Sequence, residues 1–464
     1  MAANETLTKL TSALENSESA VLAFIKNITD ERSFIEIDRF VGSDTELGSA
    51  DGEGVVTGFA TIDGRQIAIF CTNPAVLKGS IGKKGADKIV RLLKNASKIE
   101  TPVLGVWDSQ GARFGEGIEV LEGYASIMDA MTYIFGTVPA IMVNKGKNFG
   151  MSAYISDACD ICIGYDKSEM STASPLIIAA KAKADVSKMA TAAIHQKQTG
   201  QYTTVVKSDK ELKDILIKSL DLLCEKSVKS KDDPNRTSTA LSEGAKASIL
   251  IDEIFDKKSF LELKAEFCSE VVTGFARLDG MTVGVVAFNK EGGVRLSSAA
   301  CRKIRHHLWT CQDSMGNIPM VTLLDCNGTV TDMAEENGDL IREVSALMCH
   351  TMADAQARVT LITGNAFGAG YVAFASKAAS DYTLAYPQAK IGMVESEAAA
   401  ELLYGDEIGK SKNKEVAAKK MARTYAEENQ YAVSVAKQGY LDNIIDPAFS
   451  RPYLIAAVRM FKDK

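Results

Sequence analysis

The sequence predicts an α/β protein built from two duplicated domains, each a twisted β-sheet flanked by helices. The first observation is an internal repeat. Residues 55–64 read V-V-T-G-F-A-T-I-D-G and residues 271–280 read V-V-T-G-F-A-R-L-D-G, so eight of ten positions agree at a separation of 216 residues. The second observation is that apolar, strand-like runs alternate with helical segments in both halves, a pattern typical of sheets covered by helices.

The repeat extends in both directions from this strand. It also includes S-F-I-E-I at 33–37 with S-F-L-E-L at 259–263, Pro102 with Pro319, Asp108 with Asp325, Gly111 with Gly328, and G-K-N-F-G at 146–150 with G-N-A-F-G at 364–368. The offset drifts from 226 through 216 to 218, so the surface loops changed length while the elements stayed. This indicates duplicated domains rather than a short solenoid repeat.

Each half predicts the same order of elements. A β-rich run (65–71 and 281–288) precedes a helical segment, which is 299–311 in the second half. A nearly continuous apolar run then ends in an aspartate and a glycine turn; the two runs are 102–107 and 319–324. Unbroken apolar runs of this length are typical of strands buried on both faces.

The domain boundary is predicted from a helix and a change of composition. A chain of 464 residues is too long for one core, and two domains of about 200 residues are expected. Residues 208–226 place apolar side chains at helical spacing, and a polar, proline-containing linker follows. The predicted domains are therefore 1–243 and 244–464. Late in the second, residues 407–430 are rich in Ala, Lys and Glu and predict one long helix.

Composition excludes several classes of protein. A content of 46% hydrophobic and 24% charged residues is that of an ordinary globular protein. The net charge of −7 argues against broad nucleic-acid binding, although a local basic cluster could still bind a small polyanion. Nine scattered cysteines suit a reducing compartment, and neither a signal peptide nor a membrane-length apolar run is present. We expect a cytoplasmic protein that could dock on a membrane complex.

Paired glycine turns are the motifs with the clearest chemistry. Each half has two, at 108–113 and 148–152 in the first and at 325–329 and 367–370 in the second. Glycine lets backbone N–H groups face a ligand, and a helix that begins there favours negative charge. Two such turns would form an oxyanion hole in each half. The alternative is that these glycines only permit tight turns and close packing.

At these residues the chain resembles the carboxyltransferase subunits of biotin-dependent acyl-CoA carboxylases and decarboxylases, such as the propionyl-CoA carboxylase β-subunit and the glutaconyl-CoA decarboxylase α-subunit. The family motif D-S-G-G-A-R-I-x-E-G is similar to D-S-Q-G-A-R-F-G-E-G at 108–117. Further matches are His195 with Thr199-Gly200, residues 271–287, F-G-A-G at 367–370, and G-Y-L-D-N-I-I-D-P-A-F-S-R at 439–451. The resemblance covers residue 30 or so to the C-terminus, and it implies two ClpP/crotonase-like domains.

The resemblance also implies a reaction and a site. One oxyanion hole would hold the enolate of the acyl-CoA thioester, and the other would hold the ureido anion of biotin. The biotin nitrogen can itself remove the α-proton, so no protein acid or base is required. The donors would be backbone groups at Gly111, Ala112, Gly150 and Met151 in the acyl-CoA half, and at Gly328, Thr329, Gly368 and Ala369 in the carboxybiotin half. Contacts to CoA or biotin are expected at Arg113, Phe149, Phe367 and Gly370.

Partners follow from what the chain lacks. It has no A-M-K-M biotinylation motif and no biotin carboxylase domain, so biotin is expected on a separate carrier protein. The resemblance implies further subunits, either a biotin carboxylase or a membrane decarboxylase pump. In this family the site forms between the first domain of one protomer and the second domain of another. We therefore expect a homodimer at least, and a hexamer is compatible with the family.

Four departures from the family pattern leave alternatives open. Met151 and Gln110 stand where the family has glycine, Glu395-Ser396 stands where it has Gly-Gly, and residues 180–185 read A-K-A-K-A-D where T-G-E is expected. Met151 could narrow a substrate channel or face the packing side. One alternative is a biotin-independent crotonase-like enzyme that uses Glu116 or Glu395 as acid or base. The other is a non-catalytic scaffold subunit. Neither the acyl group nor the direction of transfer is fixed by the sequence.

Other residues carry weaker signals. The four histidines have no metal-ligand spacing, and a lone Cys159-x-x-Cys162 is more typical of small core residues than of a zinc site. His306-His307 suits a surface or half-buried pair. Arg113 could order the first turn or meet a phosphate. Lys181, Lys183 and Lys188 could attract CoA phosphates or form a solvated helix face.

Overall fold

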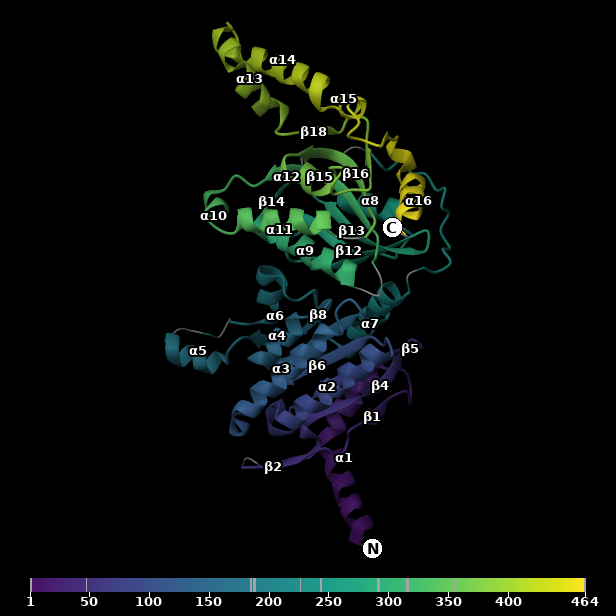
Figure 1. Ribbon diagram of the computed structural model, residues 1–464, viewed down its shortest axis with the longest axis vertical. Coiled ribbons are helices and arrows are strands. Elements are labelled where there is room, and N and C mark those ends of the chain that lie inside the picture. The colour runs from purple at the N-terminus through teal and green to yellow at the C-terminus, as the bar shows by residue number, and fades with distance from the viewer. Residues whose placement is uncertain are drawn as a thin grey trace. The chain divides into compact units, whose positions relative to one another are not determined.

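The computed structural model describes residues 2–46, 48–183, 186, 189–225, 227–242, 244–289, 293–313, 317–353 and 356–462. The chain divides into two compact units that meet in the sequence between Cys224 and Glu225. Each unit contains one large mixed sheet with helices packed on it (Figure 1). The predicted α/β class, with two sheets flanked by helices, is confirmed.

The first unit is built on an eight-stranded sheet. Its strands are β1 (Ile35–Ile37), β4 (Val55–Ile62), β5 (Arg65–Thr72), β6 (Val103–Ser109), β7 (Ala140–Phe149), β8 (Ile161–Tyr165), β9 (Glu169–Ser171) and β10 (Thr204–Val206), and a separate hairpin pairs β2 (Ser43–Thr45) with β3 (Gly48–Ala50). Its helices are α1 (Ala2–Ile28), α2 (Lys83–Lys98), α3 (Ile118–Thr132), α4 (Met151–Asp157), α5 (Pro175–Ala182), α6 (Ala192–Ile194) and α7 (Asp209–Cys224). Shorter turns of helix are η1 (Asp51–Gly54), η2 (Leu77–Gly79), η3 (Phe114–Glu116) and η4 (His195–Thr199).

The second unit is built on a nine-stranded sheet. Its strands are β11 (Leu261–Leu263), β12 (Val271–Leu278), β13 (Met281–Phe288), β14 (Val294–Leu296), β15 (Met320–Thr329), β16 (Arg358–Phe367), β17 (Tyr382–Ala385), β18 (Lys390–Gly392) and β19 (Asn443–Ile444). Its helices are α8 (Ala247–Ile254), α9 (Ser298–Asp313), α10 (Met333–Glu336), α11 (Leu340–Ala353), α12 (Ala369–Phe374), α13 (Ser396–Lys410), α14 (Lys414–Tyr425), α15 (Ala432–Lys437) and α16 (Ser450–Phe461), with short turns at η5 (Ala426–Gln430) and η6 (Pro447–Phe449).

The two sheets have equivalent strand orders. The first runs β1-β4-β5-β6-β7-β8-β10 with β9 on β7, and the second runs β11-β12-β13-β15-β16-β17-β19 with β18 on β16. In both, the first two pairings are antiparallel and the later ones are parallel. In the part of the first unit that the structure describes, the pairing of β14 with β15 is reduced to a single parallel bridge between Ile81 and Ala112. The duplication expected from the repeat is therefore present element by element.

The repeated V-V-T-G-F-A forms β4 and β12, near the antiparallel edge of each sheet. A Cβ on Gly58 would come 2.6 Å from the Phe34 ring, and one on Gly274 would come 2.7 Å from the Phe260 ring. The same Cβ would come closer still to the carbonyl oxygen of Ile35 or Leu261 in the paired edge strand. The glycine therefore allows both the close pairing of the edge strand and the contact of its aromatic ring. This contact explains why the repeat includes both S-F and V-V-T-G-F-A.

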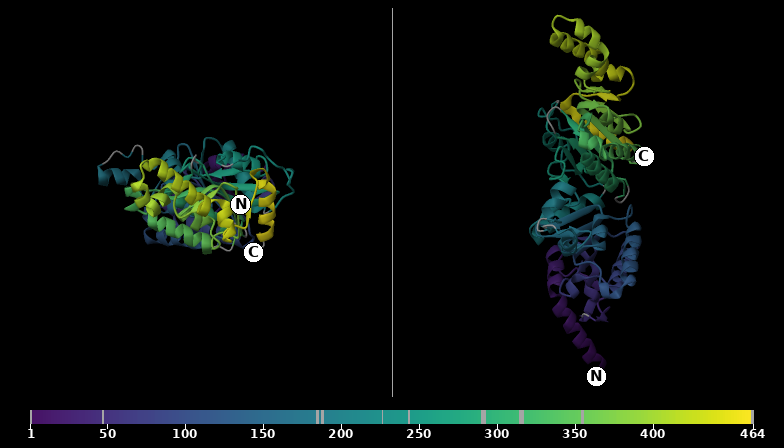
Figure 2. Two further views of the ribbon diagram at one scale, coloured as in Figure 1. Left: turned by 90° about the horizontal axis from the view of Figure 1, so that it is seen from above. Right: turned by 90° about the vertical axis from the view of Figure 1, so that its left-hand side faces the viewer.

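Helices bury the faces of both sheets. In the first unit α2 and α3 pack side by side over the strands, and α1 packs with α7 (Figures 1 and 2). Every residue of β12 and β13 is buried, which explains their nearly continuous apolar sequences. Within the described residues, no helix combines the length and the apolar character that a bilayer span requires.

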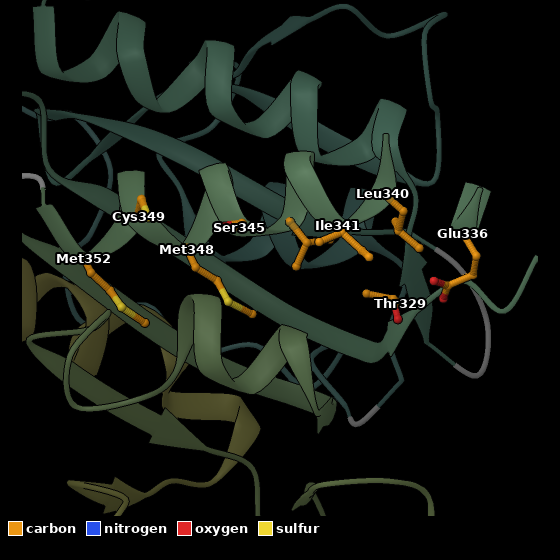
Figure 3. A pocket seen from close by; sticks show the side chains of 9 residues that line it. Thr329, Glu336, Leu340, Ile341, Ser345, Met348, Cys349 and Met352 are labelled. Atoms are coloured by element: carbon orange, nitrogen blue, oxygen red, sulfur yellow. The ribbon is translucent and has the colours of Figure 1, made fainter. Parts of the chain in front are cut away.

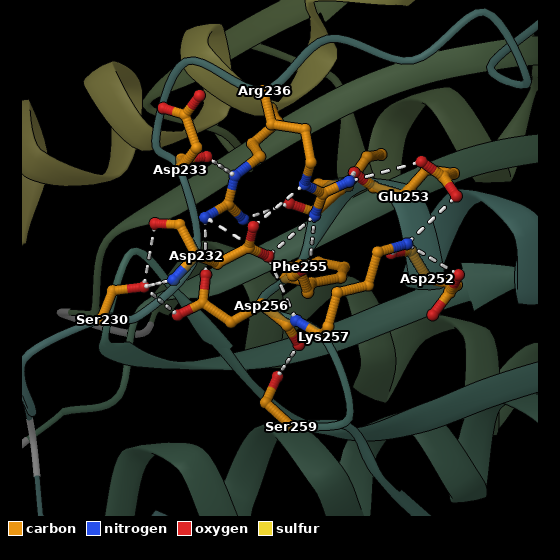
Figure 4. Close-up of polar contacts among 12 residues, drawn as sticks. Ser230, Asp232, Asp233, Arg236, Asp252, Glu253, Phe255, Asp256, Lys257 and Ser259 are labelled. Atoms are coloured by element: carbon orange, nitrogen blue, oxygen red, sulfur yellow. Dashed lines mark hydrogen bonds and ion pairs between the residues drawn. The ribbon is translucent and has the colours of Figure 1, made fainter.

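The segment expected to be a linker packs on the second unit. Arg236 donates to the carboxylate of Asp232 (3.0 Å) and to the carbonyl oxygens of Glu253 (2.7 Å) and Phe255 (3.1 Å), as Figure 4 shows. The polar composition therefore reflects ion pairs on the surface of the second unit, not a flexible connection. The first compact unit ends at Cys224, before this segment.

Arg451, at the end of the motif 439–451, fastens the same segment from inside. Its guanidinium is fully buried and donates to the Asp233 and Ile254 carbonyl oxygens (2.9 and 2.7 Å) and to the Asp256 carboxylate (2.7 Å). One side chain thus joins α16, α8 and the segment before α8.

The long helix predicted over 407–430 is wrong as one continuous element. The structure ends α13 at Lys410 and begins α14 at Lys414. Asn413 breaks the helix because its side chain caps the new one, accepting the Val416 amide at 3.2 Å. Composition favours helix throughout this stretch, but the capping bond of Asn413 starts a new helix.

We expect Arg451→Met to lower the free energy of unfolding of the second unit by about 3–5 kcal/mol, because it leaves the Asp256 carboxylate without its buried cationic partner. Urea unfolding followed by tryptophan fluorescence and circular dichroism measures this. The control is Arg342→Ala, which removes an exposed pair with Asp339 and should change stability by about 0.5 kcal/mol or less. Equal effects of the two substitutions would contradict this role of Arg451.

Candidate active site

The four predicted glycine turns lie at the carboxyl ends of neighbouring parallel strands. Gly111 and Gly150 follow β6 and β7, whereas Gly328 and Gly368 lie at the ends of β15 and β16. All four have positive φ, at 97°, 75°, 83° and 49°. A Cβ is strained in this region, so glycine is required for the backbone conformation itself.

Within each unit the two turns come together. A Cβ on Gly111 would lie 2.6 Å from the carbonyl oxygen of Phe149, and one on Gly328 would lie 3.6 Å from that of Phe367. Phe149 and Phe367 are the residues just before the second turn of each unit. The structure therefore brings the sequence-predicted turns together in two pairs, one in each unit.

Several of the proposed donor amides, among them those of Gly111, Gly150 and Gly368, are used inside the protein. The amide of Gly150 donates to Ser171 of β9 at 2.9 Å, and that of Gly368 donates to Gly392 of β18 at 2.9 Å. The next residues, Met151 and Ala369, begin α4 and α12, and the first amides of a helix have no acceptor within it. The carbonyl groups of Gly150 and Gly368 each accept a helix amide at 3.1 Å. Because N–H and C=O point in opposite directions across a trans peptide, the N–H groups of Met151 and Ala369 face away from the helix.

The remaining turns are oriented by the same principle. The amide of Gly111 donates to the Ser109 hydroxyl (3.0 Å), and its carbonyl accepts the amide of Ile81 (3.0 Å), which directs the Ala112 N–H to the opposite side. In the second unit the equivalent parallel bridge joins Leu296 to Thr329, and the Val330 amide donates to the Leu296 carbonyl oxygen (3.0 Å). The Gly328 carbonyl therefore faces β14, which directs the Thr329 N–H to the opposite side. Arg295 donates to the carbonyl oxygen of Asn327 (2.9 Å) beside this turn. Each pair of turns therefore presents two outward amides.

Two hollows adjoin the second pair of turns. A polar cavity of about 200 Å³ is lined by Asn327, Asn365, Phe367, Lys390, Glu395, Ser396 and Glu397. An apolar groove of about 510 Å³ runs along α11, and Figure 3 shows Ile341, Met348 and Met352 along it, with Thr329 at one end. Ile341 is 74% exposed, which is unusual for a large apolar side chain of a folded unit.

Comparison with known proteins decides the family. The model of the carboxyl transferase domain matches residues 14–464. The chain belongs to the carboxyl transferase family. It is 30% identical over 454 residues to a putative propionyl-CoA carboxylase β chain of Bacillus subtilis, covering 94% of this chain and 89% of that protein. It is 27% identical over 471 residues to the methylmalonyl-CoA decarboxylase α subunit of Propionigenium modestum, covering 94% and 88%.

Among solved structures, the chain is similar to the transcarboxylase 12S hexamer with methylmalonyl-coenzyme A and methylmalonic acid bound. The TM-score is 0.92 at 26% identity, and the match covers 99% of this chain and 95% of that chain. The predicted family and fold are thus confirmed. The chain is an acyl-CoA carboxyltransferase subunit of the biotin-dependent carboxylase and decarboxylase class.

Arg113 of this carboxyltransferase lies beneath the first turn. Its guanidinium is 2% exposed and contacts the carboxylates of Glu53 (2.7 Å) and Glu116 (2.8 Å). It also donates to the carbonyl oxygen of Ser80 at 3.2 Å. Of the two roles considered for Arg113, this geometry supports ordering the turn, because a guanidinium enclosed by two carboxylates is not available to a phosphate.

The three other residues expected to contact CoA or biotin have packing roles in the structure. Phe149 and Phe367 are buried at 5% and 3% exposure, although Phe367 also borders the polar cavity. A Cβ on Gly370 would lie 2.5 Å from the Cys326 sulfur, so glycine there permits α12 to approach β15. Contacts of these residues with a ligand stay a prediction.

Met151 packs inward. Its side chain is partly buried against the core cluster of the first unit, which also includes Trp107, Tyr124 and Ile155. Of the two alternatives for Met151, packing and narrowing of a channel, this placement favours packing. The departure from glycine at this position leaves the backbone amide in place, since α4 begins there as α12 does at Ala369.

The two acidic residues considered as an acid or base are both held in ion pairs. Glu116 contacts Arg113 and also accepts the Lys83 amide at 2.7 Å. Glu395 contacts Arg295 at 2.6 Å, with both side chains about 40% exposed. Both carboxylates are thus engaged by an arginine, which suits a structural role.

The weaker signals have structural explanations. His195 contacts the carbonyl oxygen of Met170 (2.7 Å) and the Thr199 hydroxyl (3.1 Å), and so braces the turn of helix before Gly200. Burial lowers the pKa of His307 to about 3, so it is neutral. Cys159 and Cys162 are buried, and the described residues contain no group of ligands suited to a metal. Lys181 and Lys183 are exposed near the end of α5, and Lys188 and part of 180–185 lie outside the described residues.

Sequence reasoning missed the charged cluster below the first turn. Glu18 of α1 is 1% exposed and lies beside Gly52, and Lys88 donates to the Gly52 carbonyl at 2.9 Å. Burial and repulsion from the Glu36 carboxyl raise the pKa of Glu18 to about 7. No local motif marks Glu18, because its importance comes from long-range packing of α1.

We expect the stability of the first unit to fall as pH rises from about 4.5, the ordinary carboxyl pKa, through about 7, because the folded state holds the Glu18 proton more tightly than the unfolded chain. Glu18→Gln should remove this dependence and stabilise the protein by on the order of 1–3 kcal/mol at pH 8, with a smaller gain at pH 5. Urea unfolding at both pH values measures it. The control Glu15→Gln, on the exposed side of α1, should have the same small effect at both.

Proposed function

We propose that the two units carry the two halves of a carboxyl transfer. The turns of the first unit hold the enolate oxygen of an acyl-CoA thioester, and the turns of the second hold the ureido oxygen of biotin. The observation that carries this proposal is the pairing of positive-φ glycine turns, once in each unit, with amides directed outward. It narrows the eight expected donors to Ala112 and Met151 in the first unit and Thr329 and Ala369 in the second.

These amides are suited to developing negative charge. They are fixed before substrate arrives, so they need no reorganisation during the reaction, and each such donor contributes about 3–4 kcal/mol to transition-state stabilisation. Biotin, when bound, supplies a carboxyl carrier whose ring nitrogen can accept the α-proton. The chain's own residues then bind and orient the two oxygens, and no side chain has to exchange a proton. The glycines leave the space that a Cβ would fill.

Partners are part of this proposal. A separate carrier protein brings the biotin to the second unit, which fits the lack of a biotinylation motif within residues 1–464. Exposed apolar side chains flank both pairs of turns, Phe114 and Ile118 in the first unit and Met333 and Ile341 in the second. Such surfaces favour association, and we propose that a second copy covers them in a homodimer or hexamer. Further subunits and a cytoplasmic location, where nine thiols stay reduced, complete the proposal.

The test is carboxyl exchange between free biotin and a panel of acyl-CoA thioesters, with labelled malonyl- or methylmalonyl-CoA as donor. We expect label to reach the acceptor only when biotin is present. Exchange without biotin would favour an enzyme that uses Glu116 or Glu395 instead. Absence of exchange with every thioester would favour a non-catalytic scaffold, and either result overturns the proposal.

Gly368→Val should lower kcat for exchange at least about 100-fold while the oligomer remains intact, because the branched side chain disfavours the positive φ that directs the Ala369 amide. Size-exclusion chromatography monitors the oligomer. The matched control is Gly439→Val, which has the same strain at a φ of 82° but lies after α15, with nothing within 4 Å of its Cβ. Retained exchange in Gly368→Val would contradict the hole proposed for the second unit.

A further inference from the structure

Both β7 and β16 bulge just before their glycine turns, and in the same way. In the pairing of β6 with β7, Trp107 lies opposite Asn144 and Ser109 lies opposite Asn148, so an advance of two residues in β6 matches an advance of four in β7. Between β15 and β16, Leu324 to Cys326 faces Ile362 to Ala366. Each second strand therefore carries two extra residues at equivalent positions, which opens a gap in the backbone hydrogen bonds.

An aspartate fills each gap. The Asp108 carboxylate accepts the amide of Lys147 at 3.0 Å, and the Asp325 carboxylate accepts the amide of Asn365 at 2.8 Å. Both aspartates are half-buried. The side chain thus replaces the backbone carbonyl that a regular ladder would offer, and it satisfies a bulge amide that would otherwise lack an acceptor.

The carboxylates also explain a second pair of glycines. A Cβ on Gly364 would lie 2.6 Å from the Asp325 carboxylate, and one on Gly146 would be closer still to Asp108. Neither glycine has positive φ, so their conformation does not demand glycine. They are glycines because the carboxylate occupies the place of a Cβ. In each unit the aspartate and the glycine therefore belong together, because the carboxylate of one fills the space beside the other.

Each pair of aspartate and glycine lies immediately before the turns. Asp325 is three residues before Gly328, and Gly364 is four residues before Gly368. The carboxylate therefore joins the two strands at the point from which both turns project, and it sets the separation of the outward amides. A displacement of about 1 Å in such a site can cost a factor of about 100 in rate.

We propose that Asp108 and Asp325 are positioning residues, each fixing the spacing between the two oxyanion turns of its unit. They touch no reacting atom, and they act through the bulge. The inference rests on the function proposed above, because it assigns these turns to transition-state stabilisation.

Asp325→Ala should lower kcat for biotin-dependent exchange about 10–100-fold with KM changed less than about 3-fold, because donors that act in the transition state are misplaced. Asp325→Asn keeps an acceptor oxygen for the Asn365 amide and should stay within about 3-fold of the wild type. A purely structural role predicts a lower thermal midpoint with unchanged kcat per folded molecule, and that result would overturn the proposal.

A double-mutant cycle tests the shared space. Gly364→Ala should impair exchange by forcing the Asp325 carboxylate aside, and adding Asp325→Ala should relieve this clash, so that the double variant is more active than additivity allows. Strictly additive effects would show that the Asp325 carboxylate and a Cβ at residue 364 do not compete for the same space, which contradicts this account. Gly405→Ala in α13, where a Cβ meets nothing within 4 Å, is the control and should leave exchange unchanged.

Hydrogen exchange gives a readout that is independent of activity. In Asp325→Ala, amides of residues 365–370 should exchange faster than in the wild type, whereas Asp325→Asn should match the wild type. If these amides are as well protected from hydrogen exchange in Asp325→Ala as in the wild type, the positioning role is contradicted, even if the wild type transfers carboxyl groups. If the wild type transfers no carboxyl group, the proposed function is contradicted. Faster hydrogen exchange in Asp325→Ala would in that case still support the spacing role of the aspartate.

Discussion

The pair of glycine turns in each unit depends on one constraint. Two neighbouring parallel strands must end at the same edge of the sheet, with the peptides at their ends turned outward. Parallel pairing supplies the common edge, as β6 with β7 and β15 with β16 show. Positive φ at the four glycines then turns the chain. Each peptide is fixed through its carbonyl oxygen, so that the opposite N–H faces the site. The backbone, more than any side chain, therefore carries the chemistry proposed for this carboxyltransferase.

The two units meet this constraint with different supports. Beneath the first turn, Arg113 is enclosed with Glu53, where both side chains are at most 2% exposed. Beside the second, Arg295 pairs with Glu395 while about 40% of each remains exposed. A pair out of contact with water is screened less and held more firmly than an exposed one. The turn of the first unit thus rests on the less screened pair, and the turn of the second unit borders a polar cavity that Glu395 also lines.

Much of this was predictable from the repeat, because V-V-T-G-F-A aligned the two halves and exposed the paired turns. The α/β class, the duplication and the family followed from those residues. The supports did not, since Glu18, Glu53 and Arg295 lie far in sequence from the turns and reach them only through packing. Polar composition suggested a linker where Arg236 and Arg451 instead form ion pairs. Asp108 and Asp325 were aligned, but their role required the bulge, which no sequence period reveals.

The central claim is that the first unit binds the acyl-CoA thioester oxygen and the second unit binds the ureido oxygen of biotin. A crystal structure of the protein with an acyl-CoA and free biotin bound tests it most directly. The account predicts the thioester oxygen at about 2.7–3.1 Å from the amides of Ala112 and Met151, and the ureido oxygen at the same distance from those of Thr329 and Ala369. Both ligands bound at one unit's turns, or either bound away from them, would contradict it.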